Sequence, residues 1–170
     1  MELADYIRNV ADFPQSGITY KDITPLLGNA DAFQEAVTRL SNPLAQLGIQ
    51  KVVGIESRGF ILGASLANRV GAGFVPIRKK GKLPFQTLQQ EYNLEYGTDC
   101  LEIHRDAILP GEKVVIHDDV LATGGTAAAA CELVQRLGGE VVQVSFLVEL
   151  SFLNGKEKIK QHPIFSLVTF

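Results

Sequence analysis

Short apolar segments rich in β-branched residues alternate with helical patterns along most of this chain. The strand candidates are residues 51–55, 73–77, 113–117 and 141–150. Between them, residues 59–70 and 127–137 carry apolar side chains at helical spacing, and glycine follows each segment. Earlier in the chain, Asp31 and Gln34 have the spacing of a capping box at the start of a further helix. Apolar strands that alternate with helices form a parallel sheet covered on both faces, so the sequence predicts an α/β fold with a central, mostly parallel sheet flanked by helices.

The length and composition fit one folded domain, which we place at residues 1–170. Hydrophobic residues make up 46% of the chain and charged residues 21%, which leaves a sizeable core to bury. The net charge is −3, and no basic stretch alternates with aromatic residues, so we expect no nucleic-acid partner. The chain starts without a basic segment followed by an apolar one, and no apolar run approaches about 20 residues. We therefore expect a cytoplasmic protein with no membrane contact.

Ligands of such sheets bind at the carboxyl ends of the strands, where loops lead into helix N-termini. The strand ends of interest are therefore those after Ile55, Ile77 and His117. The third carries the strongest signal, because two carboxylates, Asp118 and Asp119, are followed by a turn that opens a helix. The turn residues are Ala122, Thr123, Gly124, Gly125 and Thr126.

This turn is suited to hold a phosphate group. Glycine lets the backbone approach a phosphate closely, the free N–H groups at a helix start point toward it, and the helix dipole favours an anion there. The hydroxyl groups of Thr123 and Thr126 add two donors. Hydrogen bonds to a charged group contribute about 1.5–3 kcal/mol each, so four or five of them can hold a dianion without a lysine.

The neighbouring carboxylates suit a different task. Asp118 and Asp119 can accept hydrogen bonds from vicinal ribose hydroxyls and can orient water molecules bound to Mg²⁺. For either feature alone, an ordinary strand-to-helix turn in which Asp119 satisfies backbone N–H groups is the better explanation. Together, at this spacing, they predict a sugar-phosphate site. The chain contains no GxxxxGK[ST] and no GxGxxG, which argues against a nucleoside triphosphatase and a dinucleotide-binding dehydrogenase.

Residues 78–101 interrupt the alternation of strands and helices. The segment begins Arg78-Lys79-Lys80-Gly81-Lys82 and is too long and too charged for a routine connection. We interpret it as a mobile lid, part of which, around residues 87–92, forms an extended hairpin arm. A solvated excursion of the chain is the alternative.

The segment from Val114 to Thr126 resembles the binding motif for phosphoribosyl pyrophosphate (PRPP) in type I phosphoribosyltransferases. Three further stretches resemble the adenine phosphoribosyltransferase family within that class, and the matches cover nearly the whole chain. They are residues 11–25, similar to its N-terminal hood, residues 52–60, similar to its pyrophosphate loop, and residues 77–84 with 94–97, similar to its flexible loop. The resemblance implies the type I phosphoribosyltransferase fold, with a hood over residues 1–30 and a flexible active-site loop over residues 78–101.

The resemblance also implies an activity. Members of this family are glycosyltransferases, more narrowly pentosyltransferases of purine salvage, that make AMP and pyrophosphate from adenine and PRPP. The reaction passes through an oxocarbenium-like transition state under a closing lid. The resemblance further implies a homodimer, with Mg²⁺ as cofactor, held mainly through PRPP and water molecules without dedicated protein ligands.

Site residues follow from the resemblance by position. It assigns adenine binding to Ile18, Thr19, Tyr20, Lys21, Arg58, Phe60 and Leu150. It assigns pyrophosphate binding to Glu56, Ser57, Arg58, Arg78 and Lys82, with a cis peptide between Glu56 and Ser57. The 5-phosphate and ribose fall to Asp118, Asp119, Ala122, Thr123, Gly124, Gly125 and Thr126. Asp118, Asp119 and Glu95 are the implied catalytic carboxylates, and Glu95 either manages a proton on the purine or supports the cationic transition state.

Two residues depart from the family pattern. His117 stands where an aliphatic residue is usual, and we interpret it as structural, because it and Asp118 point to opposite faces of a strand. Lys21 stands where arginine is common, which weakens any bidentate contact there. Two other functions stay open. One is a xanthine- or orotate-directed phosphoribosyltransferase, which shares the phosphate turn, and the other is a PRPP-sensing regulator, although the chain has no room for an added DNA-binding module.

Overall fold

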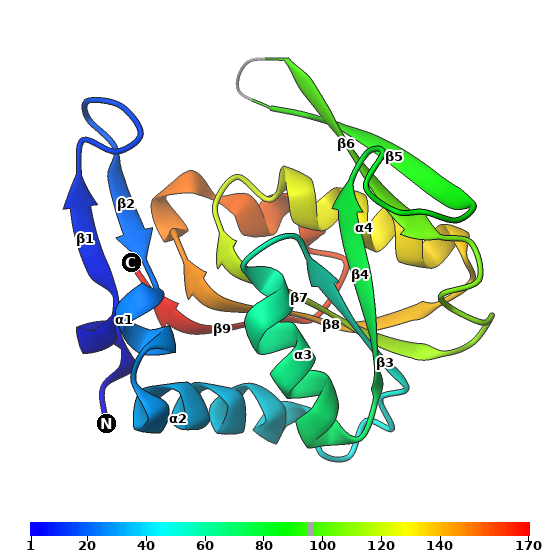
Figure 1. The fold of residues 1–170 in the computed structure, drawn as a ribbon, viewed down its shortest axis with the longest axis horizontal. Helices are drawn as coiled ribbons and strands as arrows, with labels where there is room; N and C mark the ends of the chain where they lie inside the picture. Colours follow the sequence, from blue (N-terminus) through cyan, green and yellow to red (C-terminus); the bar gives the residue numbers. More distant parts are fainter. Residues whose placement is uncertain (95–96) are drawn as a thin grey trace.

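A seven-stranded sheet forms the centre of the protein (Figure 1). The computed structural model describes residues 1–94 and 97–170. Five neighbouring strands run parallel, in the order β4 (Gly73–Lys79), β3 (Lys51–Ile55), β7 (Lys113–Leu121), β8 (Glu140–Glu149) and β9 (Ile164–Thr169). Beyond β4, the strands β6 (Thr98–His104) and β5 (Thr87–Asn93) extend the sheet in antiparallel fashion. The predicted α/β fold with a mostly parallel sheet is confirmed.

Helices cover both faces of this sheet (Figure 1). Helices α2 (Ala30–Ser41) and α3 (Gly59–Val70) pack on one face, and α4 (Gly125–Arg136) packs on the other together with the short helix η4 (Gly155–Ile159). Successive strand residues alternate between the faces, so Val52 belongs to the core under α2 and α3, and Val53 to the core under α4. Both faces of the sheet are therefore buried, which explains why the parallel strands are apolar throughout.

Local signals set the ends of two helices. Helix α3 has the predicted bounds, and Gly71 ends it with a φ of 71°, in the left-handed region that glycine adopts without strain. The predicted capping box at Asp31 and Gln34 was wrong. Helix α2 starts earlier than predicted and is capped by Asn29, whose Oδ1 accepts the N–H of Ala32 at 2.9 Å. Asp31 lies within the first turn, where its negative charge is attracted by the positive end of the helix dipole.

Strand β7 runs beyond the predicted end at His117. Asp118 pairs with Phe146 of β8, and Val120 pairs with Val148, so the ladder continues past the two acids. The apolar second half of β8 supplies these partners, and the pattern of one strand cannot reveal the pairing partner. The acids therefore lie inside a strand rather than in the loop after it.

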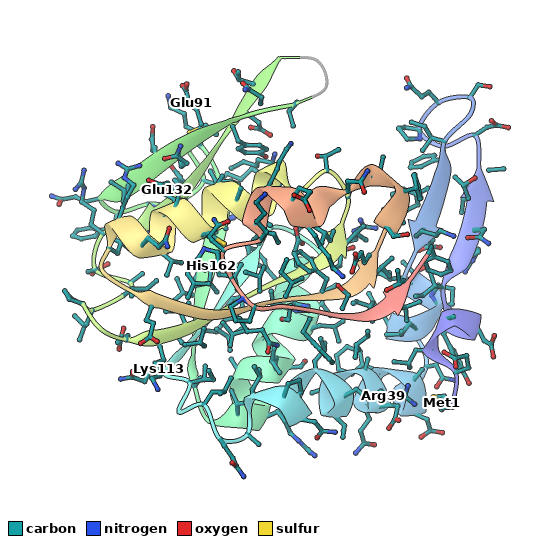
Figure 2. All side chains as sticks on the ribbon, turned by 180° about the vertical axis from the view of Figure 1, so that it is seen from behind. Met1, Arg39, Glu91, Lys113, Glu132 and His162 are labelled. Carbon is teal, nitrogen blue, oxygen red and sulfur yellow. The ribbon has the colours of Figure 1, made fainter. Side chains whose placement is uncertain are left out.

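The N-terminal segment forms a separate two-stranded sheet, in which β1 (Arg8–Ala11) pairs antiparallel with β2 (Thr19–Asp22). The short helices η1 (Leu3–Tyr6) and α1 (Thr24–Leu27) flank it. Arg39 Nη2 on α2 donates a hydrogen bond of 2.7 Å to the carbonyl oxygen of Met1, and the two residues lie side by side in Figure 2. The strands β1 and β2 were not predicted. Their residues are mostly polar, so no apolar pattern marks them, and pairing with each other is what stabilises them. Strands β6 and β9 were not predicted either.

Strands β5 and β6 form a hairpin arm that lies over α4 (Figure 1). Arg136 Nη1 on α4 donates a hydrogen bond of 2.8 Å to the carbonyl oxygen of Gln89, and Leu88 and Tyr92 pack against the core on this face. The predicted extended hairpin within residues 78–101 is confirmed. Its movement as a lid stays a prediction, and Glu95 lies outside the residues that the structure describes.

The short helices η2 (Asn42–Leu44) and η3 (Ser151–Leu153) complete the fold. Helix η2 follows α2 directly, because Pro43 lacks the N–H group that another α-helical turn requires. No helix within residues 1–94 and 97–170 combines the length and the apolar character needed to cross a membrane.

We expect the substitution Gly54→Ala to destabilise the protein. A Cβ atom on Gly54 would lie 2.6 Å from the ring of Phe74 and 3.2 Å from the carbonyl oxygen of Gly59. The resulting strain should lower the free energy of unfolding by about 1–3 kcal/mol, measured by urea denaturation. Gly73→Ala on β4 is the matched control, because its Cβ would meet nothing closer than the flexible side chain of Lys51 at 3.4 Å. Equal stability of the two variants would contradict this account of the packing.

Candidate active site

A cavity of about 380 Å³ opens where the β1–β2 hairpin meets the carboxyl ends of β3 and β7. Its lining residues are Ile18, Thr19, Tyr20, Lys21, Ile55, Glu56, Ser57, Arg58, Lys79, Leu101, Asp118, Asp119, Val120, Ala122, Thr126 and Leu150. These residues come from well-separated segments of the chain. The fold therefore brings together the predicted hood, the predicted pyrophosphate loop, the acid pair and the phosphate turn around one cavity.

Glu56 lies in the loop after β3, and positively charged side chains surround its carboxylate. Its carboxylate accepts the N–H of Lys79 at 2.7 Å and lies 3.2 Å from Arg78 Nε and 2.7 Å from Lys82 Nζ. Burial raises the pKa of Glu56, but the hydrogen bonds from Lys82 and Lys79 and the nearby cations outweigh it, so that the pKa lies below its usual value. The peptide bond between Glu56 and Ser57 is cis, as predicted.

Asp118 and Asp119 form a buried acid pair beside this cationic group. Asp118 Oδ1 accepts the N–H of Asp119 at 2.9 Å. Burial raises the pKa of Asp118 well above its usual value, and the charge of Asp119 adds to the effect. Burial also raises the pKa of Asp119, while Arg58, whose Nε lies 2.8 Å from Asp119 Oδ2, opposes the shift. That oxygen is buried, and its contact with the Arg58 guanidinium compensates its charge.

Arg58 joins the acid pair to the hairpin above it. Its Nη1 donates to the hydroxyl of Tyr20 on β2, and its guanidinium carbon lies 5.1 Å from the centre of the Tyr20 ring. Because Asp119 holds the other side of the same guanidinium, the Arg58 side chain is fixed at the wall of the cavity. A planar group held from both sides can present its remaining N–H donors in one direction.

Strand β2 has one edge with which no other strand of the described residues pairs. Its other edge pairs with β1 in a sheet of two strands, and residues 18–21 line the cavity. The ammonium of Lys21 is held at 2.7 Å by Asn9 Oδ1 and lies 3.5 Å from the centre of the Phe170 ring. Lys21 therefore offers the cavity its backbone rather than its charge.

The phosphate turn has the geometry expected of an anion site. The N–H groups of residues 123–126 lie at the N-terminus of α4 and donate no hydrogen bond to any described residue. Gly124 adopts a φ of 80°, and a Cβ atom there would collide with the carbonyl oxygen of Gly155. A Cβ atom on Gly155 would in turn collide with the carbonyl oxygen of Ala122. Helix η4 thus supports the turn from behind through close backbone contact.

The structure places most predicted site residues at the cavity, with six exceptions among the described residues. Thr123, Gly124 and Gly125 belong to the phosphate turn, and the first two of them line a smaller pocket next to the cavity. Phe60 does not line the cavity, because its ring packs edge-to-face on Phe74 with the ring centres 5.9 Å apart. The adenine contact of Phe60 stays a prediction made from the family resemblance. Arg78 and Lys82 do not line the cavity either. Both form ion pairs with Glu56, which does line it.

Lys79 lines the cavity although the sequence assigned it no role. Its Nζ donates to the Tyr92 hydroxyl at 2.9 Å and pairs with Asp99, so two residues of the hairpin arm hold it. Burial lowers the pKa of Lys79, but the hydrogen bonds that its ammonium group donates to Asp99 and Tyr92 outweigh it and leave the pKa raised. Its place in the basic run from Arg78 to Lys82 was the available signal, but only the fold shows which member of the run reaches the cavity.

Comparisons with known proteins agree with this geometry. Residues 27–167 match the family model described as the phosphoribosyl transferase domain. The curated adenine phosphoribosyltransferase of Flavobacterium johnsoniae is 57% identical over 170 residues, which cover 100% of both chains. The crystal structure of adenine phosphoribosyltransferase from Rhodothermus marinus aligns with a TM-score of 0.95 at 54% identity, over 99% of this chain and 96% of that one. The Saccharomyces cerevisiae enzyme, complexed with an imino-altritol bisphosphate and adenine, aligns with a TM-score of 0.93 at 41% identity, over 98% and 96% of the two chains.

A mostly parallel sheet that carries an acid pair and a phosphate turn at its carboxyl edge is the fold and site of a type I phosphoribosyltransferase. The likeness over the full length narrows this class further. The chain belongs to the adenine phosphoribosyltransferase family, the pentosyltransferases that make AMP and pyrophosphate from adenine and PRPP.

His117 lies in the core rather than in the cavity. It is fully buried, its Nδ1 lies 3.0 Å from Ser145 Oγ, and a Cβ atom on Gly63 of α3 would touch its ring. Burial lowers the pKa of His117 to about 4, so the imidazole is neutral at physiological pH. These contacts agree with the predicted structural role.

We expect His117→Val to leave turnover within about twofold of the parent while lowering the unfolding free energy at pH 7.5 by about 1–2 kcal/mol. The depressed pKa also makes the parent sensitive to acid. The unfolded chain takes up a proton near pH 6.5 and the folded chain only near pH 4, so stability is full above pH 6.5 and falls below it. At pH 5 the loss from this group should be about 2 kcal/mol. Urea denaturation at pH 7.5 and pH 5 should therefore show a smaller pH effect in the variant, and a large loss of turnover in a folded variant would contradict the structural role.

Proposed function

We propose that the cavity binds PRPP and adenine together and that its own residues carry the family reaction. The observation that supports this most directly is the shared wall of the cavity. The acid pair, both ends of the phosphate turn, Lys79, Glu56 with its two paired cations behind it, and strand β2 meet there. Each part of the two substrates therefore has a group of complementary chemistry in or beside one cavity.

The 5-phosphate of PRPP is proposed to bind the turn from Ala122 to Thr126. The free backbone N–H groups and the dipole of α4 stabilise a dianion there. The ribose hydroxyls then donate hydrogen bonds to the carboxylates of Asp118 and Asp119, which line the same cavity a few residues before the turn. The same carboxylates place negative charge beside the sugar, which stabilises the positive charge that develops at its anomeric carbon.

Adenine is proposed to lie beneath the edge of β2. An open strand edge offers N–H and C=O groups in alternation, and the amine edge of adenine carries a donor next to an acceptor. Leu150 and Ile18 offer apolar contact to the ring faces, and Arg58, fixed by Tyr20 and Asp119, offers further donors. A ring nitrogen of the base then attacks the anomeric carbon as pyrophosphate leaves.

The leaving pyrophosphate meets positive charge at the edge of the cavity. Lys79 lines the cavity, and Arg78 and Lys82 lie close to it around Glu56. Cations held in advance at the place where negative charge develops lower the barrier without reorganising during the reaction. Glu95 stays a predicted catalytic residue on the strength of the family resemblance.

The residues also suit Mg²⁺ bound with PRPP. Among the described residues no group of three or more histidine, cysteine or acidic side chains could hold a metal by itself. Asp118 and Asp119 could nevertheless orient water molecules bound to such an ion, since both carboxylates line the cavity and oxygen is the ligand atom that Mg²⁺ prefers. When bound, Mg²⁺ supplies positive charge to the leaving pyrophosphate.

Closure of the hairpin arm would exclude water from the activated sugar. The arm already lies next to the phosphate turn, since a Cβ atom on Gly125 would lie 3.4 Å from the carbonyl oxygen of Asn93 and 3.6 Å from the ring of Tyr92.

The homodimer and the cytoplasmic location stay predictions made from the sequence.

We expect PRPP- and Mg²⁺-dependent release of pyrophosphate with adenine and little release with hypoxanthine, guanine, xanthine or orotate. Oxo-purines reverse the donor and acceptor at the edge that β2 reads, so they leave polar groups of the site unpaired, and discrimination on the order of 10⁴-fold follows. A parallel assay of the five bases measures this. Equal turnover of hypoxanthine would overturn the adenine site and keep the PRPP site, whereas PRPP binding without turnover of any base would favour a sensor.

We expect Asp118→Asn to lower turnover on the order of 100-fold and at the same time to raise the melting temperature. The raised pKa of Asp118 means that its ionised form is disfavoured in the folded protein at pH 7, and a neutral amide removes both the burial penalty and the repulsion from Asp119. Asp106→Asn, on an exposed turn, is the control and should change neither quantity. A variant that keeps full turnover would remove Asp118 from the proposed mechanism.

A further inference from the structure

Glu102 on β6 is a buried carboxylate for which the proposed chemistry has no role. Only 2% of its surface is exposed, and it lies directly opposite Arg78 in the ladder between β4 and β6. It does not line the cavity and cannot contact the substrates there. A fully buried acid is costly unless it is well paired, so the partners of Glu102 indicate what it does.

Both oxygens of Glu102 accept hydrogen bonds from neighbouring segments. Oε1 accepts the backbone N–H of Lys82 at 3.1 Å and that of Leu83 at 2.9 Å. Oε2 lies 3.4 Å from Thr87 Oγ1 and 3.3 Å from Gln89 Nε2, both on β5. The carboxylate thus ties the turn after β4 to the base of the hairpin arm.

These bonds keep the acid ionised. Burial raises the pKa of Glu102, but the backbone hydrogen bonds from Leu83, Gly81 and Lys82 outweigh it and leave the pKa lowered. Hydrogen bonds to a charged acceptor are roughly twice as strong as neutral ones. The turn is therefore held by a strong acceptor from below, although its own residues are largely exposed.

The position of this turn decides where the charge of Lys82 lies. Lys82 Nζ reaches Glu56 Oε1 at 2.7 Å, so the turn that Glu102 fixes delivers an ammonium group to the edge of the cavity. A long side chain on a loose turn loses more conformational freedom when it binds a ligand than one on a fixed turn. Fixing the backbone of Lys82 should therefore strengthen its contact with pyrophosphate.

We propose that Glu102 is a positioning residue that holds the backbone of Lys82 so that its ammonium group meets the pyrophosphate of PRPP. The inference rests on the proposed function, because it requires that Lys82 bind pyrophosphate. It adds a residue outside the cavity that sets substrate affinity through the turn between β4 and β5.

The test compares Michaelis constants in Glu102→Ala with those of the parent. We expect the KM for PRPP, and the KM for pyrophosphate in the reverse reaction, to rise about tenfold, while the KM for adenine stays within about twofold. Glu102→Gln keeps an oxygen that can accept the N–H groups of Lys82 and Leu83 but loses the charge, so its KM values should lie between those of Glu102→Ala and the parent, closer to the parent. Glu91→Ala on the exposed side of the same hairpin is the matched control and should change none of them (Figure 2).

A double-mutant cycle shows whether Glu102 acts through Lys82. Lys82→Ala should raise the KM for PRPP by itself, and adding Glu102→Ala to it should change the KM by less than about twofold. If Glu102→Ala does not fold, Glu102→Asp replaces it, because a side chain shorter by one methylene cannot reach the turn.

Each remaining outcome counts against a defined part of the inference. An equal rise in both backgrounds, or a glutamine variant as impaired as alanine, would overturn the positioning role and leave the proposed function intact. An unchanged KM in Lys82→Ala would overturn the pyrophosphate role of Lys82 in the proposed function, and the inference with it.

Discussion

The parallel pairing of β7 with β3 on one side and β8 on the other places every group of the site. Because the ladder continues past His117, Asp118 and Asp119 sit within the strand at the wall of the cavity, where burial raises the pKa of both. Two neighbouring buried carboxylates are unfavourable without a positive partner. Arg58, which follows β3, is the partner that the parallel arrangement brings alongside. The same guanidinium holds Tyr20, so the position of the N-terminal hairpin depends on this pairing as well.

The charges of the site are separated in a way that suits the breaking of a glycosidic bond to pyrophosphate. Negative charge lies on the acid pair beside the place proposed for the sugar, and positive charge lies around Glu56 and at Lys79 beside the place proposed for the leaving group. Such an arrangement lowers the energy of the separated charges of the transition state more than that of the neutral bond. It also costs stability in the free protein, since burial disfavours the ionised form of Asp118.

Much of the fold could be predicted, because its signals are local. Helix α3 and strand β3 have the predicted bounds, since apolar periodicity and the glycine after α3 are written in the neighbouring residues. The extent of β7, the strands β1 and β2 and the cap of α2 could not be predicted in the same way. Each depends on a partner that is distant in sequence or on a choice between two nearby polar residues. The place of Phe60 in a motif could not show that its ring packs on Phe74, because that contact joins α3 to β4.

The sequence by itself determined the class of fold, the acid pair and the turn with its free N–H groups, because these follow from residue types at fixed short spacing. It also indicated the cis peptide after Glu56 through the family resemblance. Only the tertiary structure decided that Lys79 rather than Arg78 or Lys82 lines the cavity, that Gly155 supports the phosphate turn, and that Glu102 holds the turn of Lys82. The physical reason is the same in each case: these contacts join residues from different segments, and the packing of the sheet and its loops sets their distances.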